Sequence, residues 1–596
     1  DTARSRGLGD VYKRQYKACF YSLPELNQIF IIKDSKLLHR YIFFALFISV
    51  FVSNQLYPQD TLIIHPISFD TPSPIGWVAQ YDVKVEFPQE EKTWRKILMK
   101  QTLKCDPRTS ADKYDCGEWD YIWDALIFIP VNDTVEAYKL GSFVTPYGKR
   151  LEMGGEKGWE WVYDLTDYAP LLRGKKRLRI GNNQELLDLK FEFIEGVPPR
   201  NPISIQNIYP LGEYDGHYGY TYRYGDIVEN KVLKPRKIDL SPAASHFSIK
   251  SIISGHGHEG PNYCCEWVEK SHYFFINELK EHSWKVWKDC GNNPIYPQGG
   301  TWPYDRAGWC PGTKVDEMVF DLTYLVNPGQ TIAFDYEIEA MKDTSERKGI
   351  YKMRHQLFSF GPPNFNRNLE LVDIINPSSE DRHSRFNPTL DKPRVRIKNI
   401  GTQEIRRVKF FYGLKGRHKS IYHWRGSLQF LDDVIITLPM NDWQGLRDEQ
   451  YFYVDAVTIN GRKDENDIDN KLMSKVNIPS VFPENFIMRL KTNNHGRAKQ
   501  NSFKISDYDG NIYYSGDTFL DSSEYNIAIN LNEGFYQFHF SDINEDGIDR
   551  LWWKQKDSIG IAGELGFYDV NYTELIKFSP DFGQEIRMDF IIGPIP

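Results

Sequence analysis

The stretch Thr331-Ile-Ala-Phe-Asp-Tyr-Glu-Ile338 alternates large apolar side chains with small or polar ones. Its apolar members, Ile332, Phe334, Tyr336 and Ile338, are spaced two residues apart. Successive side chains of an extended strand point to opposite faces of a sheet. The stretch therefore predicts a β-strand with one buried face.

The same alternation recurs in short runs that Gly, Pro, Asn and Asp separate. Further strands are predicted at 121–130, 161–165, 187–194 and 247–253. Long runs with the 3.6-residue period of a helix are almost absent. We predict an all-β fold built from antiparallel sandwiches.

The chain has 596 residues, which is too many for one core, because domains usually contain roughly 100 to 200 residues. Turn-rich stretches at 196–202 and 376–379 indicate boundaries. Residues 375–480 resemble a small fibronectin-like sandwich, and residues 481–596 have the same character. We predict that both are accessory modules.

The N-terminal region reads as targeting sequence. Residues 1–15 look like translated adapter sequence, and Lys36 and Arg40 precede the twelve-residue apolar run Tyr41–Val52. That run is the length of a signal-peptide core and shorter than the roughly 20 residues that span a bilayer. We predict that 1–55 is a non-native leader plus signal peptide and that the protein is exported, to the periplasm or beyond. A membrane anchor is the alternative.

Composition excludes one class of partner. The net charge is -8, the isoelectric point is near 6.0, and no basic stripe is present, so we predict no nucleic-acid partner. Aromatic residues make up 15% of the chain, which suits sandwich cores and also faces that stack on sugars.

Six cysteines follow the leader, and an exported protein can oxidise them. Cys105 and Cys116 bracket a polar loop, while Cys290 and Cys310 bracket a Gly/Pro-rich one, so we predict two local disulfides. The adjacent pair Cys264-Cys265 is left open, because neighbouring Cα atoms about 3.8 Å apart are closer than disulfides usually allow.

A cysteine precedes a Glu-Trp pair twice, in Cys116-Gly-Glu-Trp-Asp120 and in Cys264-Cys-Glu-Trp267. A carboxylate beside an indole is one way to tune acid/base chemistry on a sugar. A third pair, Glu160-Trp161, lacks a cysteine, so the dipeptide alone carries little information. Asp120 would lie at a strand entrance, where an ordinary turn carboxylate is the alternative.

Ser254-Gly-His-Gly-His258, with Glu266 and His272 after it, could form a metal cluster. Such a cluster would suit an exported copper oxygenase built from two sandwiches, which is the main alternative to the function given below. No His-x-Met follows in the second domain, and such histidines also serve as hydrogen-bonding loop residues.

The Gly/Pro-rich segment 293–312 contains Trp302, Trp309 and the pair Asp305-Arg306. Arginine can fork onto a carbonyl or carboxylate, and tryptophan can stack on a pyranose ring. A stapled structural loop with an internal ion pair is the alternative.

Asp542-Ile-Asn-Glu-Asp-Gly547 resembles the start of a calcium loop. Trp553 stands where an EF-hand has its twelfth-position Glu. We therefore expect a turn, or a looser calcium site at Asp542, Asn544 and Asp546.

In sequence order these segments resemble the bacterial peptide-N-glycosidase F family, amidases that cut between Asn and the first GlcNAc of an N-glycan. The resemblance covers roughly 80–340. The matching motifs are Cys116-Gly-Glu-Trp-Asp120, Phe143-Val-Thr-Pro-Tyr147, Asp164-Leu-Thr-Asp167, Ile253-Ser-Gly-His-Gly-His258, Cys264-Cys-Glu-Trp267 and Asp305-Arg-Ala-Gly-Trp-Cys-Pro-Gly312. The family pattern differs here at Tyr121, His256 and Val268.

The resemblance implies two adjacent eight-stranded jelly-roll domains, 56–225 and 226–374, with the active site along their interface. It implies no metal or organic cofactor, and we expect a monomer. The catalytic acids it implies are Asp120, Glu266 and, in an uncertain register, Glu185. The substrate-binding residues are Glu118, Trp119, His256, His258, Trp267, Arg306 and Trp309.

The function predicted from this resemblance is hydrolysis of the Asn–GlcNAc amide on glycoproteins or glycopeptides, which leaves Asp and releases the glycan. The alternatives are a copper-dependent or metal-binding protein that uses His256 and His258, and an N-glycan-binding protein without catalysis.

Overall fold

The structure is a computed structural model that describes residues 61–593, except 77–78, 90–91, 109–113, 183, 210–212, 215–216, 219–220, 259–263, 341–348, 440–442, 444–445, 447–448 and 552–559. The predicted leader and signal peptide lie outside this range. The chain divides into Asp1–Pro58 and Gln59–Pro596, and all described elements belong to the second unit. Within the described ranges no helix is long and apolar enough to cross a membrane.

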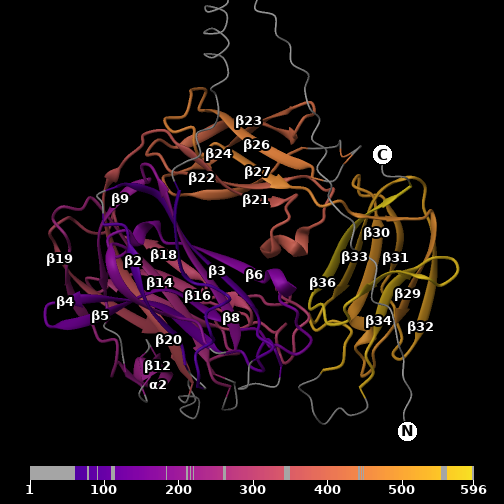
Figure 1. Cartoon of the computed structure of the whole chain (residues 1–596), viewed down its shortest axis with the longest axis horizontal. Coiled ribbons are helices and arrows are strands. Elements are labelled where there is room, and N and C mark those ends of the chain that lie inside the picture. The colour runs from indigo at the N-terminus through magenta and orange to yellow at the C-terminus, as the bar shows by residue number, and fades with distance from the viewer. Residues whose placement is uncertain are drawn as a thin grey trace, which may run out of the picture. The chain divides into compact units, whose positions relative to one another are not determined.

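Two sheets form the first sandwich, and eight of its nine strands come from the N-terminal part of the chain (Figure 1). One sheet has the order β1-β8-β3-β6 and the other β17-β5-β4-β7-β2. Their bounds are β1 Thr61–Ile67, β2 Tyr81–Phe87, β3 Trp94–Cys105, β4 Ile122–Val131, β5 Thr134–Val144, β6 Trp159–Asp164, β7 Gly174–Ile180, β8 Glu185–Glu195 and β17 Thr313–Lys314. The short 3-10 helices η1, Gly155–Lys157, and η2, Thr166–Tyr168, flank β6.

The second sandwich also has a five-stranded and a four-stranded sheet. The first has the order β12-β20-β14-β18, with β9 also on β20, and the other β13-β19-β15-β16. The bounds are β9 Arg200–Asn207, β12 Thr221–Arg223, β13 Arg236–Asp239, β14 His246–His256, β15 Lys270–Ile276, β16 Leu279–Val286, β18 Glu317–Asp321, β19 Thr331–Ile338 and β20 Ile350–Pro363. A hairpin of β10, Glu213–Tyr214, and β11, His217–Tyr218, and the helix α2, Tyr224–Val228, complete this part. β9 belongs to this sandwich although it precedes the expected boundary at 225.

The third sandwich packs the sheet β21-β22-β25 against β24-β23-β26-β27. The bounds are β21 Leu369–Asn376, η4 Asp381–Phe386, β22 Arg394–Asn399, β23 Ile405–Leu414, β24 Ser420–Leu428, β25 Asp433–Thr437, β26 Tyr451–Ile459 and β27 Lys471–Lys475. The described residues of this part thus form seven strands in two antiparallel sheets.

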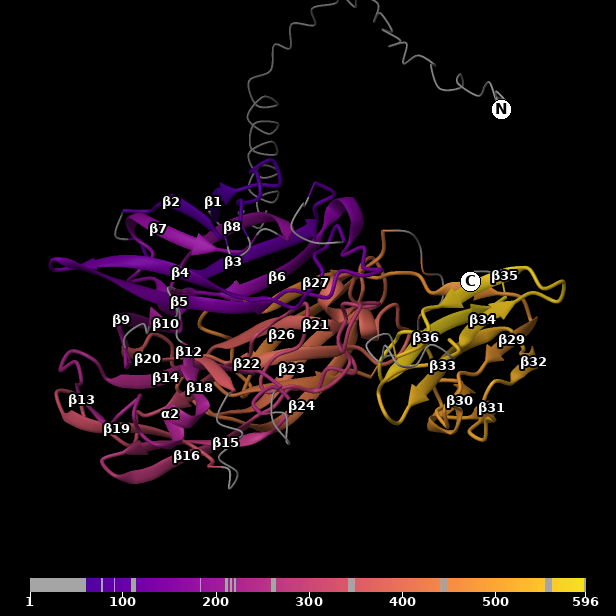
Figure 2. The same cartoon turned by 90° about the horizontal axis from the view of Figure 1, so that it is seen from below.

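The fourth sandwich pairs the sheets β28-β36-β33-β30-β31 and β32-β29-β34-β35 (Figure 2). The bounds are β28 Ser480–Phe482, β29 Asn485–Lys491, η5 Ala498–Gln500, β30 Asn501–Ser506, β31 Ile512–Gly516, β32 Glu524–Asn530, β33 Gly534–Asp542, β34 Glu564–Tyr568, β35 Glu574–Phe578 and β36 Glu585–Ile592. Only β28 with β36 is parallel among the described strand pairs.

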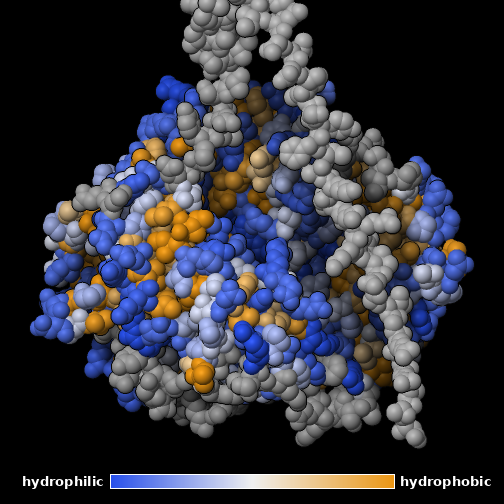
Figure 3. All heavy atoms as spheres, in the orientation of Figure 1, coloured by the Kyte–Doolittle hydropathy of each residue, from blue (hydrophilic) through white to orange (hydrophobic). Residues whose placement is uncertain are grey.

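The all-β prediction is confirmed, and each sandwich has its own apolar core. The predicted strand 331–338 is β19, and Ile332, Phe334, Tyr336 and Ile338 are all buried. The first core also includes Phe358 and Phe360 of β20, so the first two sandwiches share apolar contacts. Polar and apolar residues are interspersed over the face in Figure 3.

Both predicted disulfides are present, Cys105–Cys116 and Cys290–Cys310. The pair that the sequence left open, Cys264–Cys265, is bridged as well. Both members of this pair are fully buried in the second core, immediately before Glu266. Three bridges therefore lie beside the loops that carry the predicted site residues.

Candidate active site

Asp120 lies immediately before β4, on a segment that neighbouring elements hold by its backbone. The hydroxyl of Thr145 donates to the Trp119 carbonyl at 2.9 Å and accepts the Tyr121 N–H at 2.8 Å. Gln184 Nε2 donates to the same Trp119 carbonyl at 3.4 Å, and its Oε1 accepts from Thr145 at 3.0 Å. The position of the Asp120 backbone is thus fixed by residues far away in sequence.

The loop before Asp120 packs closely against the chain after β5. A Cβ added at Gly148 would lie 2.1 Å from the Gly117 carbonyl oxygen, so only glycine fits there. The Cys105–Cys116 bridge closes the same loop. This close backbone contact, together with the bridge, holds the approach to Asp120.

The Asp120 carboxylate accepts a hydrogen bond from the Tyr147 hydroxyl, at 2.8 Å on Oδ2. Burial raises the pKa of Asp120 to about 6, and the negative charge of Glu266 acts in the same direction. The cation of Arg306 and the Tyr147 hydroxyl lower the pKa but do not outweigh burial. Asp120 therefore changes its charge near neutral pH, which suits a group that exchanges protons.

Glu266 lies in the second sandwich, on a segment whose backbone is also fixed. Its N–H donates to the Gly257 carbonyl at 3.0 Å, and its carbonyl accepts the Ala307 N–H at 2.9 Å. Its carboxylate Oε1 accepts from Arg306 Nε at 3.2 Å. Both Glu266 and Arg306 are buried, so this ion pair lies below the surface.

Arg306 is fully buried, and protein groups engage all three of its side-chain nitrogens. Besides Nε on Glu266, Nη1 donates to the carbonyl of Tyr304 at 2.6 Å, and Nη2 to the carbonyl of Thr301 at 2.8 Å. Nη2 also donates to the Thr301 hydroxyl at 2.9 Å. The guanidinium therefore fixes Glu266 and its own loop.

A chain of polar contacts joins the two predicted acids across the two sandwiches. The Tyr147 hydroxyl, which donates to Asp120, lies 3.4 Å from Thr301 Oγ1. Thr301 in turn accepts from Arg306, and Arg306 donates to Glu266. The structure thus brings together Asp120, Glu266 and Arg306, which the sequence predicted, through Tyr147 and Thr301.

Trp309 is buried, His256 is half-buried, and their rings pack against each other. The centroids of the two rings are 5.0 Å apart and the ring planes are inclined by 26°. Trp309 Nε1 donates to the Gly255 carbonyl at 2.8 Å. His256 Nε2 lies 2.8 Å from Ser254 Oγ, and burial lowers the pKa of His256 well below its usual value. The predicted direct contacts with sugar would require exposure, whereas Trp309 is only 1% exposed.

The exposed predicted residues are different ones. Trp119, adjacent to Asp120, is 50% exposed, and His258 is exposed as well. Glu118 and Trp267 are half-buried, and the Trp267 ring lies over the Arg306 guanidinium at 4.2 Å. These side chains offer the aromatic surface beside the two acids.

Glu185, the third predicted acid, directly follows Gln184 in the chain. It is buried at the start of β8 and is paired in register with Cys105. The preceding residue, Gln184, is the one that contacts the Asp120 segment. The sequence did not single out Gln184, although it directly precedes the predicted Glu185.

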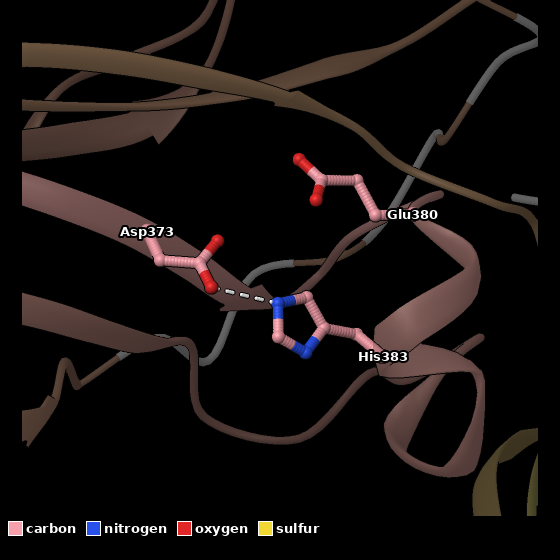
Figure 4. A group of neighbouring side chains, drawn as sticks. All are labelled: Asp373, Glu380 and His383. Carbon is pink, nitrogen blue, oxygen red and sulfur yellow. Dashed lines mark hydrogen bonds and ion pairs between the residues drawn. The ribbon is translucent and has the colours of Figure 1, made fainter. Parts of the chain in front are cut away.

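The alternative metal site at His256 and His258, with Glu266 and His272, does not appear as a ligand cluster within the described residues. The described group that could hold an ion is Asp373, Glu380 and His383 (Figure 4). There Arg382 Nη2 already contacts Asp373 at 3.2 Å and Glu380 at 2.6 Å, and His383 Nε2 lies 2.8 Å from Asp373. Side chains of this chain therefore neutralise the cluster.

The fourth sandwich contacts the loop that carries Thr301 and Arg306. Asp581 Oδ1 accepts the Trp302 indole N–H at 2.9 Å, and its Oδ2 accepts from Arg150 at 2.8 Å. Arg150 also pairs with Asp549 and donates to the Gln298 carbonyl at 3.0 Å. An accessory module thus supports the candidate site.

Comparisons with known proteins agree on one family. Residues 223–358 match the family model described as the C-terminal part of peptide-N-glycosidase F. The chain is 29% identical over 276 residues to peptide-N(4)-(N-acetyl-β-D-glucosaminyl)asparagine amidase F of Elizabethkingia miricola, which covers 43% of this chain and 70% of that protein.

Solved structures are similar at lower identity. PNGase F, described as a glycosylasparaginase from Flavobacterium meningosepticum, is 23% identical with a TM-score of 0.39, over 51% of this chain and 96% of that chain. PNGF-II is 15% identical with a TM-score of 0.38, over 51% of this chain and 66% of that chain.

Proposed function

This chain belongs to the peptide-N-glycosidase F family, and from that premise we propose that it hydrolyses the amide between Asn and the first GlcNAc of N-linked glycans. The observation that carries the proposal is the polar chain from Asp120 through Tyr147, Thr301 and Arg306 to Glu266. This polar chain contains two acids, one hydrogen-bonded to a tyrosine hydroxyl and one paired with an arginine, beside exposed aromatic rings.

In the proposed reaction, water attacks the amide carbonyl of the glycosylated Asn. The carbonyl carbon gains the water oxygen, the C–N bond breaks, and the sugar nitrogen takes a proton. The products are a peptide that contains Asp and a glycosylamine, which then loses ammonia in water. Asp120, whose pKa is about 6, accepts the water proton or orients the first GlcNAc.

Glu266 is proposed to hydrogen-bond the amide or the attacking water. Arg306 is proposed to act through Glu266, because its nitrogens are engaged within the chain. Trp119 and Trp267 are proposed to contact the sugar, since they expose ring surface, while Trp309 and His256 support them from beneath.

The alternative functions are less well supported. A copper site at His256 and His258 is not favoured, because the His256 ring stacks on Trp309 and its Nε2 bonds Ser254. Glycan binding without cleavage would use the same aromatic surface. It differs from the proposed reaction because it would leave the glycosylated Asn unchanged. Three disulfides in the described residues support the proposal that the protein is exported. We also propose that it acts as a monomer.

The test is mass spectrometry of an N-glycopeptide incubated with the full chain in water enriched in heavy oxygen. The proposal predicts release of the glycan and a labelled Asp in place of Asn. Binding of the glycopeptide with Asn unchanged would support the glycan-binding alternative instead. Loss of activity with a chelator, restored by copper, would support the metal alternative.

A further inference from the structure

The loop Asp542-Ile-Asn-Glu-Asp-Gly-Ile-Asp549, which follows β33 in the fourth sandwich, has no part in the proposed reaction. Its oxygen-bearing side chains at Asp542, Asn544 and Asp546 have the spacing with which calcium loops begin. The set contains no His or Cys, so its donors are hard oxygen ligands, which suit Ca²⁺ better than zinc or copper.

The surroundings of Asp542 indicate a ligand at this residue. It is 2% exposed, and its Oδ1 accepts the backbone N–H groups of Asn544, at 2.9 Å, and Asp546, at 3.3 Å. The other oxygen, Oδ2, is buried and accepts no hydrogen bond from any residue that the structure describes. A buried carboxylate oxygen without a partner is costly, and a bound cation would satisfy it.

The charges around the loop are not balanced at Asp542. Arg497 offsets Asp546, because its Nη2 lies 2.7 Å from Asp546 Oδ1 and also donates to the Gly547 carbonyl at 2.9 Å. No ion pair within the described residues involves Asp542. Burial, and then the negative charge of Asp546, raise the pKa of Asp542 to about 7. Within the described residues the Asp542 carboxylate therefore has no paired cation, and its Oδ2 has no hydrogen-bond partner.

We propose that this loop binds one Ca²⁺ through Asp542, Asn544 and Asp546, with backbone carbonyl groups or water completing its shell. Asn544 is exposed, so its side chain is free to turn onto the ion. Asp542 and Asp546 contribute carboxylate oxygens, and Arg497 stays on the far oxygen of Asp546. This inference stands on the loop itself and does not depend on the proposed amidase activity.

The site would also affect the candidate active site, because the loop lies against the segment that carries Arg306. Burial raises the pKa of Tyr304, and the negative charges of Asp546 and Asp542 act in the same direction. Glu545 accepts from Gln584, whose backbone N–H donates to the Gly291 carbonyl at 2.8 Å. Calcium would therefore fix the contact between the fourth sandwich and the segment 289–306.

The experiment titrates CaCl₂ into the chelator-treated full chain by isothermal calorimetry and follows thermal unfolding with and without Ca²⁺. One site per chain and a rise in the unfolding temperature are expected. Asp542→Asn should weaken Ca²⁺ binding at least about 10-fold and abolish the rise. The matched control is Asp509→Asn, an exposed aspartate in a turn of the same sandwich, which should bind like the wild type.

Because Asp542 is buried, its variant could fail to fold, so Asn544→Ala is the second variant. Asn544 is exposed, and its loss should weaken binding while the unfolding temperature in chelator stays unchanged. No heat of binding and no thermal shift for the wild type would overturn the proposal. Equal Ca²⁺ affinity of the wild type and both variants would overturn it as well.

Discussion

The loops around Asp120 and Glu266 look alike in sequence but hold their acids in different ways. Asp120 accepts a hydrogen bond from the neutral hydroxyl of Tyr147, and its pKa is about 6, so it changes its charge near that pH. Glu266 has a buried guanidinium fixed against it. A carboxyl whose pKa burial raises can exchange protons, whereas a carboxylate paired with a cation serves as a fixed acceptor. From this difference we propose proton transfer for Asp120 and positioning of the substrate for Glu266.

The largest effect is expected from Asp120→Asn, because it removes the group that exchanges the proton. The rate of glycan release from a glycopeptide should fall by at least about 100-fold. The variant should unfold at no lower temperature than the wild type at pH 8, because an ionised, buried carboxylate is lost. The control is Glu160→Gln in the third Glu-Trp pair, which is exposed and should keep full activity. Full activity of the Asp120 variant would refute the assignment.

Arg306→Met should have the next largest effect, because it leaves Glu266 buried without its cation and three carbonyls without a donor. Removing one partner of a buried pair typically costs about 3–5 kcal/mol. We expect a lower unfolding temperature and a glycan-release rate reduced roughly 10- to 100-fold. Arg306→Lys should recover part of the stability but little of the rate. A change in KM alone would instead indicate direct contact with the substrate.

Substitutions of the two neighbours of Asp120, Tyr147 and Glu266, should shift the pH dependence of the rate in opposite directions. The rate should fall as pH drops through about 6, where Asp120 takes up a proton. Tyr147→Phe removes a hydrogen bond that favours the ionised form of Asp120, so the acidic limb of the rate profile should move to higher pH. Glu266→Gln removes a negative charge that raises the pKa of Asp120, so the limb should move to lower pH. Rate profiles of glycopeptide cleavage check both, and shifts in the same direction would contradict the model.

A smaller effect is expected from Asp581→Asn in the fourth sandwich. It weakens the contacts with Arg150 and Trp302 and should loosen the segment 289–306. We expect faster hydrogen–deuterium exchange there and a rate lowered severalfold, with KM nearly unchanged. Asp517→Asn, an exposed aspartate of the same sandwich, is the control. Unchanged exchange in the Asp581 variant would show that the contact does not support the site.

The smallest effect is expected from Glu185→Gln, which tests the third acid of the family pattern. Glu185 is buried at the start of β8, and the neighbouring Gln184 contacts the backbone of the Asp120 segment. The rate should change by less than about 3-fold, the range of an ordinary substitution away from the reacting atoms. A loss as large as that of the Asp120 variant would restore Glu185 as a catalytic residue.

The sequence by itself determined the features that depend on local order. The alternation in 331–338 predicted β19 and its buried face, because side chains of a strand point alternately to its two sides. The short loops between Cys105 and Cys116 and between Cys290 and Cys310 predicted both bridges. The motif order also identified the family and two acids that prove to be close together.

Only the tertiary structure decided which neighbours those acids have. Tyr147, which holds Asp120, meets Thr301, which holds Arg306, only because two sandwiches pack together, and no spacing in the sequence encodes that contact. The same packing buries Trp309, which the sequence would expose to sugar. Burial and charge at a site depend on residues that are distant in sequence, so the roles of these side chains follow from packing rather than from the motifs.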